Sequence, residues 1–211
     1  MDSDLVRMRH EYGSESLDED MAQDPMVLFE RWFDQTHAAG VEEPNAMVLS
    51  TVGTHGPSSR TVLLKGVDER GFSFFTNHDS RKGHELETSP QCALVFGWYA
   101  LHRQVRVEGT AALLGREEVE AYFAQRPRGA QLGAWASRQS SVVADRAELE
   151  DAFAAAERRF EGQEIPPPPT WGGYVVEPSV IEFWQGRANR LHDRLRFTRI
   201  TQGWRRERLA P

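Results

Sequence analysis

The chain has 211 residues, with 25 lysines and arginines against 32 aspartates and glutamates, and a formal net charge of −7. This length suits one domain with a sizeable core. The negative charge argues against a general binder of nucleic acids or anionic membranes, since no global positive field collects polyanions. The one cysteine, Cys92, excludes an internal disulfide framework and a cysteine-based zinc cluster, and we predict no metal site. Because the N-terminus lacks an apolar signal region and no run reaches transmembrane length, we expect a cytoplasmic protein.

We predict a flexible arm over residues 1–23 and a single domain over residues 24–211. In the arm, Arg9-His-Glu-Tyr12 combines cations and an aromatic ring, which suits either a segment that closes over a site or a solvated tail. Asp24-Pro25 is the pattern of a helix N-cap followed by the first helical residue. The apolar spacing that follows, down to Gly40, predicts an amphipathic helix.

Further along, short segments rich in β-branched and aromatic residues are separated by turn signals. The predicted strands cover residues 46–52, 59–67, 72–76, 91–99, 103–114, 173–176, 181–184 and 191–197. Further helices are predicted after the N-cap Ser80, over 116–126, within 129–141 and from Asp145 onward. Because the strands look antiparallel, with one helix interposed among the first five, we predict a mainly β fold with flanking helices (α+β) that forms a small barrel.

Two basic clusters lie in this β-patterned region. Arg60 and Lys65 flank one predicted strand, and Arg81 and Lys82 fall in the first turn of a short helix. Cations there oppose the helix dipole, and the conflict disappears if an anion is bound by the free backbone N–H groups and both side chains. Only two of the 25 basic residues are lysines, and both lie in these clusters. We therefore favour a phosphate site, with solvated strand-end and helix-end cations as the alternative.

A second anion site is predicted around Tyr122 and Arg126, which are four residues apart and so share one helix face, although an ordinary surface pair has the same spacing. Arg60 and Lys65 are five apart, so a regular strand sends them to opposite faces unless a bulge intervenes. The two predicted phosphate sites hold Arg60, Arg81 and Lys82 in one case, and Lys65, Tyr122 and Arg126 in the other.

Near the C-terminus, Arg190, His192 and Arg194 alternate with other residues, which predicts that they share one face of an extended segment. Three such groups repel one another when charged, unless an anion or an electron-rich ring lies between them. An exposed strand face is the alternative, because a lone histidine is weak evidence for catalysis.

Several short motifs follow one another at regular places along the chain. They are RTVLLK (60–65), FFTN (74–77), SRKG (80–83), RQVRVEG (103–109), QLGAWAS (131–137), WGGY (171–174), EFWQGR (182–187) and RLHDR (190–194). In this order they resemble the pyridoxine (pyridoxamine) 5′-phosphate oxidase family over almost the whole chain. The resemblance implies an FMN-binding split β-barrel of antiparallel Greek-key type and a homodimer with FMN in the subunit interface.

The resemblance also implies roles for individual residues. The implied FMN contacts are Arg60, Thr61, Val62, Leu63, Leu64, Lys65, Phe75, Thr76, Arg81, Lys82, Gln104, Gln139, Ser140, Trp184 and Arg194. The implied substrate contacts are Arg9, His10, Glu11, Tyr12, Lys65, Tyr122, Arg126, Arg190, Leu191 and His192. Among these, Arg190 and His192 are expected to flank the pyridine ring as catalytic residues, and residues 9–12 to form a lid.

This chain departs from the family pattern at three of its positions. Ala130 stands where the family usually has a serine on the substrate phosphate, Phe75 replaces a common tyrosine, and His10 replaces an arginine in the lid. A neutral hydrogen bond contributes about 0.5–1.5 kcal/mol net, so the loss at Ala130 predicts weaker binding rather than inactivity.

The reaction implied is oxidation of the 4′ carbon of pyridoxamine or pyridoxine 5′-phosphate to the aldehyde pyridoxal 5′-phosphate, a step of vitamin B6 biosynthesis and salvage. FMN takes the hydride equivalent, and O2 reoxidises the flavin with release of H2O2. Two alternatives are another split-barrel flavoprotein, such as a reductase, and a non-catalytic carrier of flavin or pyridoxal phosphate. Peroxide and aldehyde formation from pyridoxamine 5′-phosphate in air distinguishes the three.

Overall fold

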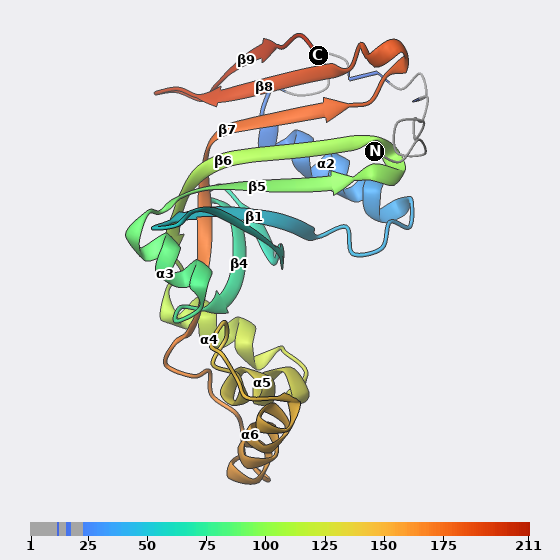
Figure 1. Ribbon diagram of the computed structural model, residues 1–211. Coiled ribbons are helices and arrows are strands. Elements are labelled where there is room, and N and C mark those ends of the chain that lie inside the picture. Colours follow the sequence, from blue (N-terminus) through green and yellow to red (C-terminus); the bar gives the residue numbers. More distant parts are fainter. Residues whose placement is uncertain (1–11, 13–15, 18–22) are drawn as a thin grey trace. The chain divides into compact units, whose positions relative to one another are not determined.

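The structure is a computed structural model that describes Tyr12, Ser16, Leu17 and residues 23–211 (Figure 1). Most of the predicted arm over residues 1–23, including Arg9, His10 and Glu11, lies outside the described residues. The helices are α2 (Pro25–Ala38), α3 (Arg81–Thr88), α4 (Arg116–Ala124), α5 (Arg128–Ala136) and α6 (Arg146–Arg159), with the short 3₁₀ turns η2 (Tyr99–Leu101) and η3 (Ala188–Arg190). The strands are β1 (Ala46–Gly53), β2 (Gly56–Leu63), β3 (Gly66–Asp68), β4 (Gly71–Asn77), β5 (Gln91–Trp98), β6 (Arg103–Leu113), β7 (Trp171–Gln185), β8 (Asp193–Arg199) and β9 (Trp204–Arg208).

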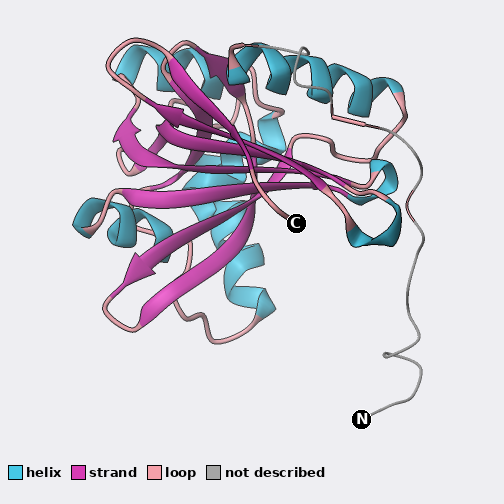
Figure 2. Cartoon of the chain, turned by 90° about the horizontal axis from the view of Figure 1, so that it is seen from above, coloured by secondary structure: helices cyan, strands magenta, loops and turns pink. Residues whose placement is uncertain are grey.

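Within the described chain the strands form one nine-stranded sheet with the hydrogen-bonded order β2-β1-β5-β6-β7-β4-β3, in which β8 pairs with β7 and β9. The pairs β3–β4, β4–β7, β7–β8 and β8–β9 are antiparallel. Helices accompany the sheet without alternating regularly with its strands (Figure 2). This is the mixed α+β arrangement predicted from the strand patterns. In the same described part of the chain, no helix is long and apolar enough to cross a membrane.

Three strand boundaries differ from the prediction. The strand expected over 59–67 is broken at Leu64-Lys65 into β2 and β3, because the N–H of Lys65 turns to donate to the carbonyl of Ser73, at 2.8 Å. The strands expected over 173–176 and 181–184 form one strand, β7, which stays extended through Pro178. The strand β9 was not predicted, since its sequence, WRRER, has no apolar alternation.

The C-terminal prediction of a shared strand face is wrong. The strand β8 begins at Asp193, and Asn189 and Arg190 have left-handed backbone conformations with φ of 57° and 60°. Two consecutive residues with positive φ turn the chain sharply at this point. Arg190 and His192 therefore lie outside the strand that contains Arg194. Alternation in the sequence therefore does not describe how these three side chains lie.

The described chain divides into two compact units, each of which is considered by itself. The first contains the described residues up to Val48, with Ala93–Glu108 and Pro178–Pro211; the second contains Leu49–Cys92 and Gly109–Glu177. The expectation of a single domain over residues 24–211 stays a prediction.

The core of the first unit is aromatic and is built around α2. Asp24 caps this helix by accepting a hydrogen bond from the N–H of Met26 at 2.8 Å, and Pro25 is its first residue, as predicted. Its buried face carries Phe29, whose ring lies 4.9 Å from that of Phe96, and Trp32, 5.3 Å from Phe183. The apolar spacing of α2 thus buries its aromatic rings against the sheet.

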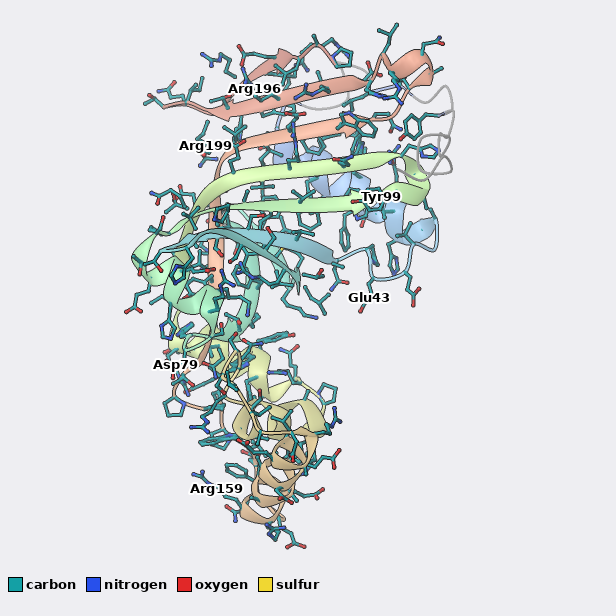
Figure 3. All side chains as sticks on the ribbon, viewed as in Figure 1. Glu43, Asp79, Tyr99, Arg159, Arg196 and Arg199 are labelled. Atoms are coloured by element: carbon teal, nitrogen blue, oxygen red, sulfur yellow. The ribbon has the colours of Figure 1, made fainter. Side chains whose placement is uncertain are left out.

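The helices α4, α5 and α6 of the second unit share a separate apolar core. Its buried members are Val119, Phe123, Leu132, Ala156, Phe160, Ile165 and Trp171. Asp145 caps α6 by accepting from the N–H of Glu148 at 3.0 Å. At the other end of α6, the guanidinium of Arg159 lies 4.4 Å from the ring centre of Trp135 on α5 (Figure 3). This packing supports Tyr122, which lies on α4, and Arg126, which lies two residues after the end of α4.

A glycine places the start of α3 directly against the preceding turn. A Cβ added to Gly83 would lie 1.9 Å from the carbonyl oxygen of His78. We expect Gly83→Ala to lower the free energy of unfolding by at least about 1–3 kcal/mol, because the backbone must shift to admit the methyl group. Urea unfolding followed by circular dichroism measures this.

The matched control is Gly129→Ala in α5, where an added Cβ meets nothing within 4 Å. Alanine there is expected to be neutral or to stabilise by up to about 1 kcal/mol, because glycine costs more backbone entropy in a helix. Equal stability of the two variants would contradict the close approach at Gly83.

Candidate active site

A cavity of about 1130 Å³ in the second unit collects residues from both predicted phosphate sites. The predicted residues that line it are Arg60, Thr61, Val62, Leu63, Lys65, Phe75, Thr76, Arg81, Lys82, Tyr122, Arg126, Gln139 and Ser140. Leu64 is the one member of the 60–65 stretch absent from this lining, and its side chain is buried instead. This volume lies slightly above the range of roughly 300–1,000 Å³ that is typical of small-molecule sites.

The break after β2 explains how Arg60 and Lys65, which are five residues apart, can face the same side. Because the chain leaves the ladder at Leu64, Lys65 no longer follows the alternation that begins at Arg60, and both side chains line the same cavity. The two cationic clusters therefore share one hollow.

The first cluster is held in place by a buried carboxylate. Glu85, on α3, accepts hydrogen bonds from Arg60 at 3.0 Å and from Nε of Arg81 at 2.8 Å. The hydroxyl groups of Thr51 and Ser58 also donate to it, at 2.5 and 2.7 Å. Burial alone would raise the pKa of Glu85, but these four donors outweigh it and lower the pKa to about 2. Glu85 is therefore charged at neutral pH.

Lys82 is buried at the start of α3, after the N-cap Ser80. Its ammonium group donates to Thr76 at 3.0 Å and to the side-chain oxygen of Gln139 at 3.1 Å. Burial, and then the charge of Arg60, lower the pKa of Lys82 to about 8, against the opposing effect of Glu85. An anion bound beside Lys82 would favour its charged form.

Two of the polar groups of the second cluster have aromatic neighbours, and none has a hydrogen-bonding partner in the described part of the chain. The side chains of Lys65, Tyr122 and Arg126 form no hydrogen bond or ion pair with any described residue, and all three line the cavity. The guanidinium of Arg126 lies 4.8 Å from the ring centre of Trp171. Burial lowers the pKa of Arg126 from its ordinary value, so a negative ligand would offset a real cost of desolvation there.

Flat aromatic rings form one wall of the cavity. The ring of Phe75 stacks on Tyr122 with centres 4.0 Å apart and planes inclined by 12°, and it lies 5.5 Å from Trp171. Ala130 also lines the cavity, which is consistent with the predicted loss of a hydroxyl contact at this position.

The remaining predicted residues belong to the first unit. Tyr12, Gln104 and Trp184 line a hollow of about 530 Å³ there, together with His102. The ring of His192 lies 4.7 Å from Trp184 and 5.6 Å from Tyr12. Tyr12 of the predicted lid and the catalytic candidate His192 thus lie near the predicted cofactor contact Trp184. Leu191, by contrast, is exposed.

The charge state of His192 follows from its neighbours. Its Nδ1 accepts a hydrogen bond from the N–H of Arg187 at 3.1 Å, so the neutral ring carries its proton on Nε2. Burial, and then the charge of Arg190, lower the pKa of His192. Arg194 is paired with Glu182, at 2.8 Å through Nε, and this pairing raises the pKa of Arg194.

Sequence reasoning missed the residues that support the cations. Glu85, Thr51 and Ser58 form no recognised motif, although Arg81 and Glu85 are four apart in a predicted helix and that spacing suggests an ion pair. Ser58 and Arg60 alternate on β2, so their shared face was also detectable.

A barrel-like antiparallel sheet with a cavity that pairs cations with aromatic rings defines a protein suited to phosphate-bearing ligands. Residues 33–160 match the family model for pyridoxamine 5′-phosphate oxidase, and residues 171–211 match that for the pyridoxine 5′-phosphate oxidase C-terminal dimerisation region. The chain belongs to the pyridoxamine 5′-phosphate oxidase family.

Individual relatives agree with this assignment. The chain is 60% identical to a pyridoxine/pyridoxamine 5′-phosphate oxidase of a Nocardioides species, covering 99% of this chain and 98% of the relative. It is 59% identical to the enzyme of the same name from Rubrobacter xylanophilus, over 99% and 97% of the two chains.

Solved structures identify the fold. PhzG from Burkholderia lata, in complex with tetrahydrophenazine-1-carboxylic acid, has a TM-score of 0.87 and 32% identity over 93% of this chain and 98% of its own. A pyridoxamine 5′-phosphate oxidase-related, FMN binding protein from Nostoc punctiforme has a TM-score of 0.69 and 17% identity over 93% and 100%. The predicted split-barrel fold class is confirmed.

The pKa of Glu85 makes stability depend on acid pH. Since its folded-state value of about 2 lies below the ordinary 4.5, the stabilisation is present above about pH 4.5 and is lost as the pH falls toward about 2. We expect a loss on the order of 2–3 kcal/mol across this window. Glu85→Gln should be less stable at neutral pH and should lose less on acidification, which urea unfolding between about pH 7 and about pH 3 measures.

The control is Glu161→Gln, an exposed position whose side chain forms no hydrogen bond or ion pair with a described residue. It should follow the parent chain at every pH. An unchanged acid dependence in Glu85→Gln would show that Glu85 does not titrate as proposed.

Proposed function

We propose that this chain is an FMN-dependent oxidase that converts pyridoxamine 5′-phosphate or pyridoxine 5′-phosphate to pyridoxal 5′-phosphate, with O2 as electron acceptor and H2O2 as product. Its family and its curated relatives of nearly full length support this activity. The observation that carries the proposal is a single cavity with two cationic clusters, one held by Glu85 and one whose polar groups have no hydrogen bond or ion pair with a described residue. An action in the cytoplasm stays a prediction.

The first cluster fits the phosphate of FMN. Arg60, Arg81 and Lys82 line the cavity beside the N-terminus of α3, where backbone N–H groups and the helix dipole favour an anion. Thr76 and Gln139, which contact Lys82, add polar groups at the same wall. Bound FMN would supply the two-electron acceptor that none of the amino-acid side chains provides.

The second cluster fits the phosphate of the substrate. Lys65, Tyr122 and Arg126 present an ammonium, a phenol and a guanidinium that no described residue engages. Charge-assisted hydrogen bonds to a phosphate would satisfy all three. A phosphate anchor of this kind favours a phosphorylated ring over an unphosphorylated acid such as the ligand in the PhzG structure.

The reaction balances with water and oxygen. The amine substrate, O2 and H2O give the aldehyde, ammonia and H2O2; the alcohol substrate and O2 give the aldehyde and H2O2. The substrate's 4′ carbon loses two electrons and its protons pass to the products. Two anchored phosphates would hold the reacting rings in a fixed mutual orientation, so much of the catalytic effect would come from positioning.

Arg190 and His192 are proposed to act on the substrate ring. Arg190 carries a permanent positive charge, and neutral His192 can donate the proton on Nε2 to the ring or its substituents. The strained backbone at Arg190 supports a functional role for this turn.

A homodimer is proposed to complete the site. Trp184, Arg190, His192 and Arg194 all lie within residues 171–211, which match a dimerisation region. Residues of that region are well placed in sequence to form part of a subunit interface, and FMN is proposed to bind there. Gln104, on strand β6 of the same unit, is proposed to contact the same cofactor.

The decisive test uses the purified full chain. We expect a yellow protein that, mixed with pyridoxamine 5′-phosphate in air, releases one H2O2 for each pyridoxal 5′-phosphate formed. A colourless protein that does not bind added FMN would contradict the proposal. Flavin bleaching without peroxide in air would instead indicate a reductase that passes its electrons to another acceptor. Neither bleaching nor peroxide would indicate a non-catalytic carrier.

A variant pair tests the substrate anchor. Arg126→Ala should raise KM for pyridoxamine 5′-phosphate at least tenfold with little change in FMN content, because a charge-assisted hydrogen bond is worth about 1.5–3 kcal/mol. Arg146→Ala, which removes an exposed arginine paired with Glu150 in the same unit, is the control and should change neither quantity. Loss of FMN from Arg126→Ala would move this residue to the cofactor site.

A second prediction concerns Arg190. Arg190→Ala is expected to lower turnover far more than FMN content, because the side chain is proposed to contact the substrate ring and not the cofactor. Absorbance spectra of the purified variant measure bound flavin, and the peroxide assay measures turnover. Parallel loss of both would place Arg190 at the cofactor instead.

A further inference from the structure

Glu85 is the carboxylate that pairs with both arginines of the first cationic cluster, Arg60 and Arg81. It is 7% exposed and lies one helical turn after Arg81. Arg81 donates to Oε1, and Thr51 and Arg60 donate to Oε2. The single hydroxyl proton of Ser58 is shared between the two oxygens, which lie 2.9 and 2.7 Å from its Oγ. The carboxylate is thus saturated by groups from β1, β2 and α3.

This arrangement immobilises Arg60. Its NH1 donates to the carbonyl of Leu49 at 3.3 Å and to Thr51, and its NH2 donates to Ser58 and to Glu85. Thr51 and Ser58 therefore serve both partners, as acceptors for the guanidinium and donors to the carboxylate. Such a closed network leaves Arg60 one orientation at the cavity wall.

Arg81 is held at one edge only. It uses Nε for Glu85, and no other hydrogen bond of its side chain to a described residue is recorded. The two terminal nitrogens therefore remain able to donate as a fork to a ligand in the cavity that Arg81 lines. Glu85 thus orients this guanidinium without consuming its bidentate edge.

The charges of the cluster add up to a match for a phosphate monoester. Arg60, Arg81 and Lys82 contribute three positive charges, and Glu85 contributes one negative charge, which leaves two positive. A phosphate monoester carries about −1.5 to −2 at pH 7. Without Glu85, three cations would repel one another in the empty site.

We propose that Glu85 is a positioning residue of the flavin-phosphate site, which orients Arg60 and Arg81 so that the cavity selects ligands bearing a phosphate monoester. The proposal rests on the function proposed above and deepens it by naming the residue behind cofactor selection. Glu85 touches neither cofactor nor substrate in this account and acts only through its two arginines.

Replacement of the Glu85 carboxylate by a neutral amide has two opposing effects on phosphate binding. A more positive site would attract a dianion more strongly. A glutamine, however, cannot accept from all four donors, so Arg81 loses the one hydrogen-bond acceptor that its side chain has among the described residues. Lys82 also loses the nearby anion that supports its charged form beside Arg60, so the net charge rises by less than one. The loss of orientation therefore decides the sign, and phosphate selection should fall.

The experiment compares two flavins that differ only in the phosphate. The full chain is freed of flavin, and the dissociation constants of FMN and of riboflavin are measured by quenching of flavin fluorescence. For Glu85→Gln we expect the preference for FMN over riboflavin to fall at least tenfold, with riboflavin affinity nearly unchanged. Glu85→Asp keeps the charge and should restore most of the preference.

The matched control is Glu118→Gln. Glu118 also pairs with an arginine, Arg70, at 2.7 Å, but on an exposed surface away from the cavity lining. Its preference for FMN should equal that of the parent chain. If Glu85→Gln binds FMN and riboflavin more weakly by the same factor, Glu85 has only a structural role. If the preference for FMN is unchanged or stronger, Glu85 competes with the phosphate for the arginines. Either result overturns the proposal.

Two further measurements distinguish a failure of the proposed function from a failure of the proposal for Glu85. If the parent chain binds neither flavin, the proposed function fails before Glu85 is tested. If Glu85→Gln does not fold, Thr51→Val removes one buried hydroxyl that serves both Glu85 and Arg60. This variant should lower the same preference about threefold, and no change in it would overturn the proposal.

Discussion

The cavity depends on keeping like charges together in the absence of a ligand. Arg60, Arg81 and Lys82 line one wall, and two of them reach the carboxylate of Glu85 while the third is held by neutral oxygens of Thr76 and Gln139. A buried carboxylate is costly unless it is fully hydrogen-bonded, and a buried ammonium is costly unless it is paired. Each group here offsets the desolvation of its neighbour, so the protein's own side chains hold the three cations together.

The second cluster is organised differently. Lys65, Tyr122 and Arg126 have no described anionic partner, and aromatic contacts hold two of them: Tyr122 stacks on Phe75, and Arg126 lies over Trp171. Aromatic rings fix a side chain without using its hydrogen-bond donors. The first cluster is therefore held rigidly and is neutralised only in part by Glu85, whereas the second cluster keeps its donors free. This difference suits a cofactor that stays bound and a substrate that must leave after each turnover.

Local signals in the sequence predicted the helix starts and most strands. Asp24, Ser80 and Asp145 each cap a helix where their side-chain chemistry indicated, because capping depends on residues two or three positions away. The break at Lys65 could not be predicted, since it depends on pairing with Ser73 across a turn. The cationic side of the site was detectable because cations at a helix start oppose the helix dipole. Glu85 was missed because its hydroxyl partners lie 27 and 34 residues away.

Backbone strain gathers near the residues that carry the proposed chemistry. The non-glycine residues with positive φ in the described chain are Glu43, His102, Ser140, Asn189 and Arg190. Ser140 and Arg190 are predicted ligand contacts, Asn189 adjoins Arg190, and His102 packs on Tyr12 with ring centres 4.5 Å apart. Glu43, in the loop before β1, is the exception (Figure 3).

Each such conformation costs about 1–3 kcal/mol and persists only where surrounding contacts enforce it. Around Arg190, the N–H of Leu191 donates to the carbonyl of Ala188, and the N–H of Arg187 donates to the ring of His192. The turn is thus closed by the very histidine that is proposed to work beside Arg190. The ring of His192 therefore helps to hold the strained turn that contains Arg190, in place of the regular strand that the sequence alternation predicted.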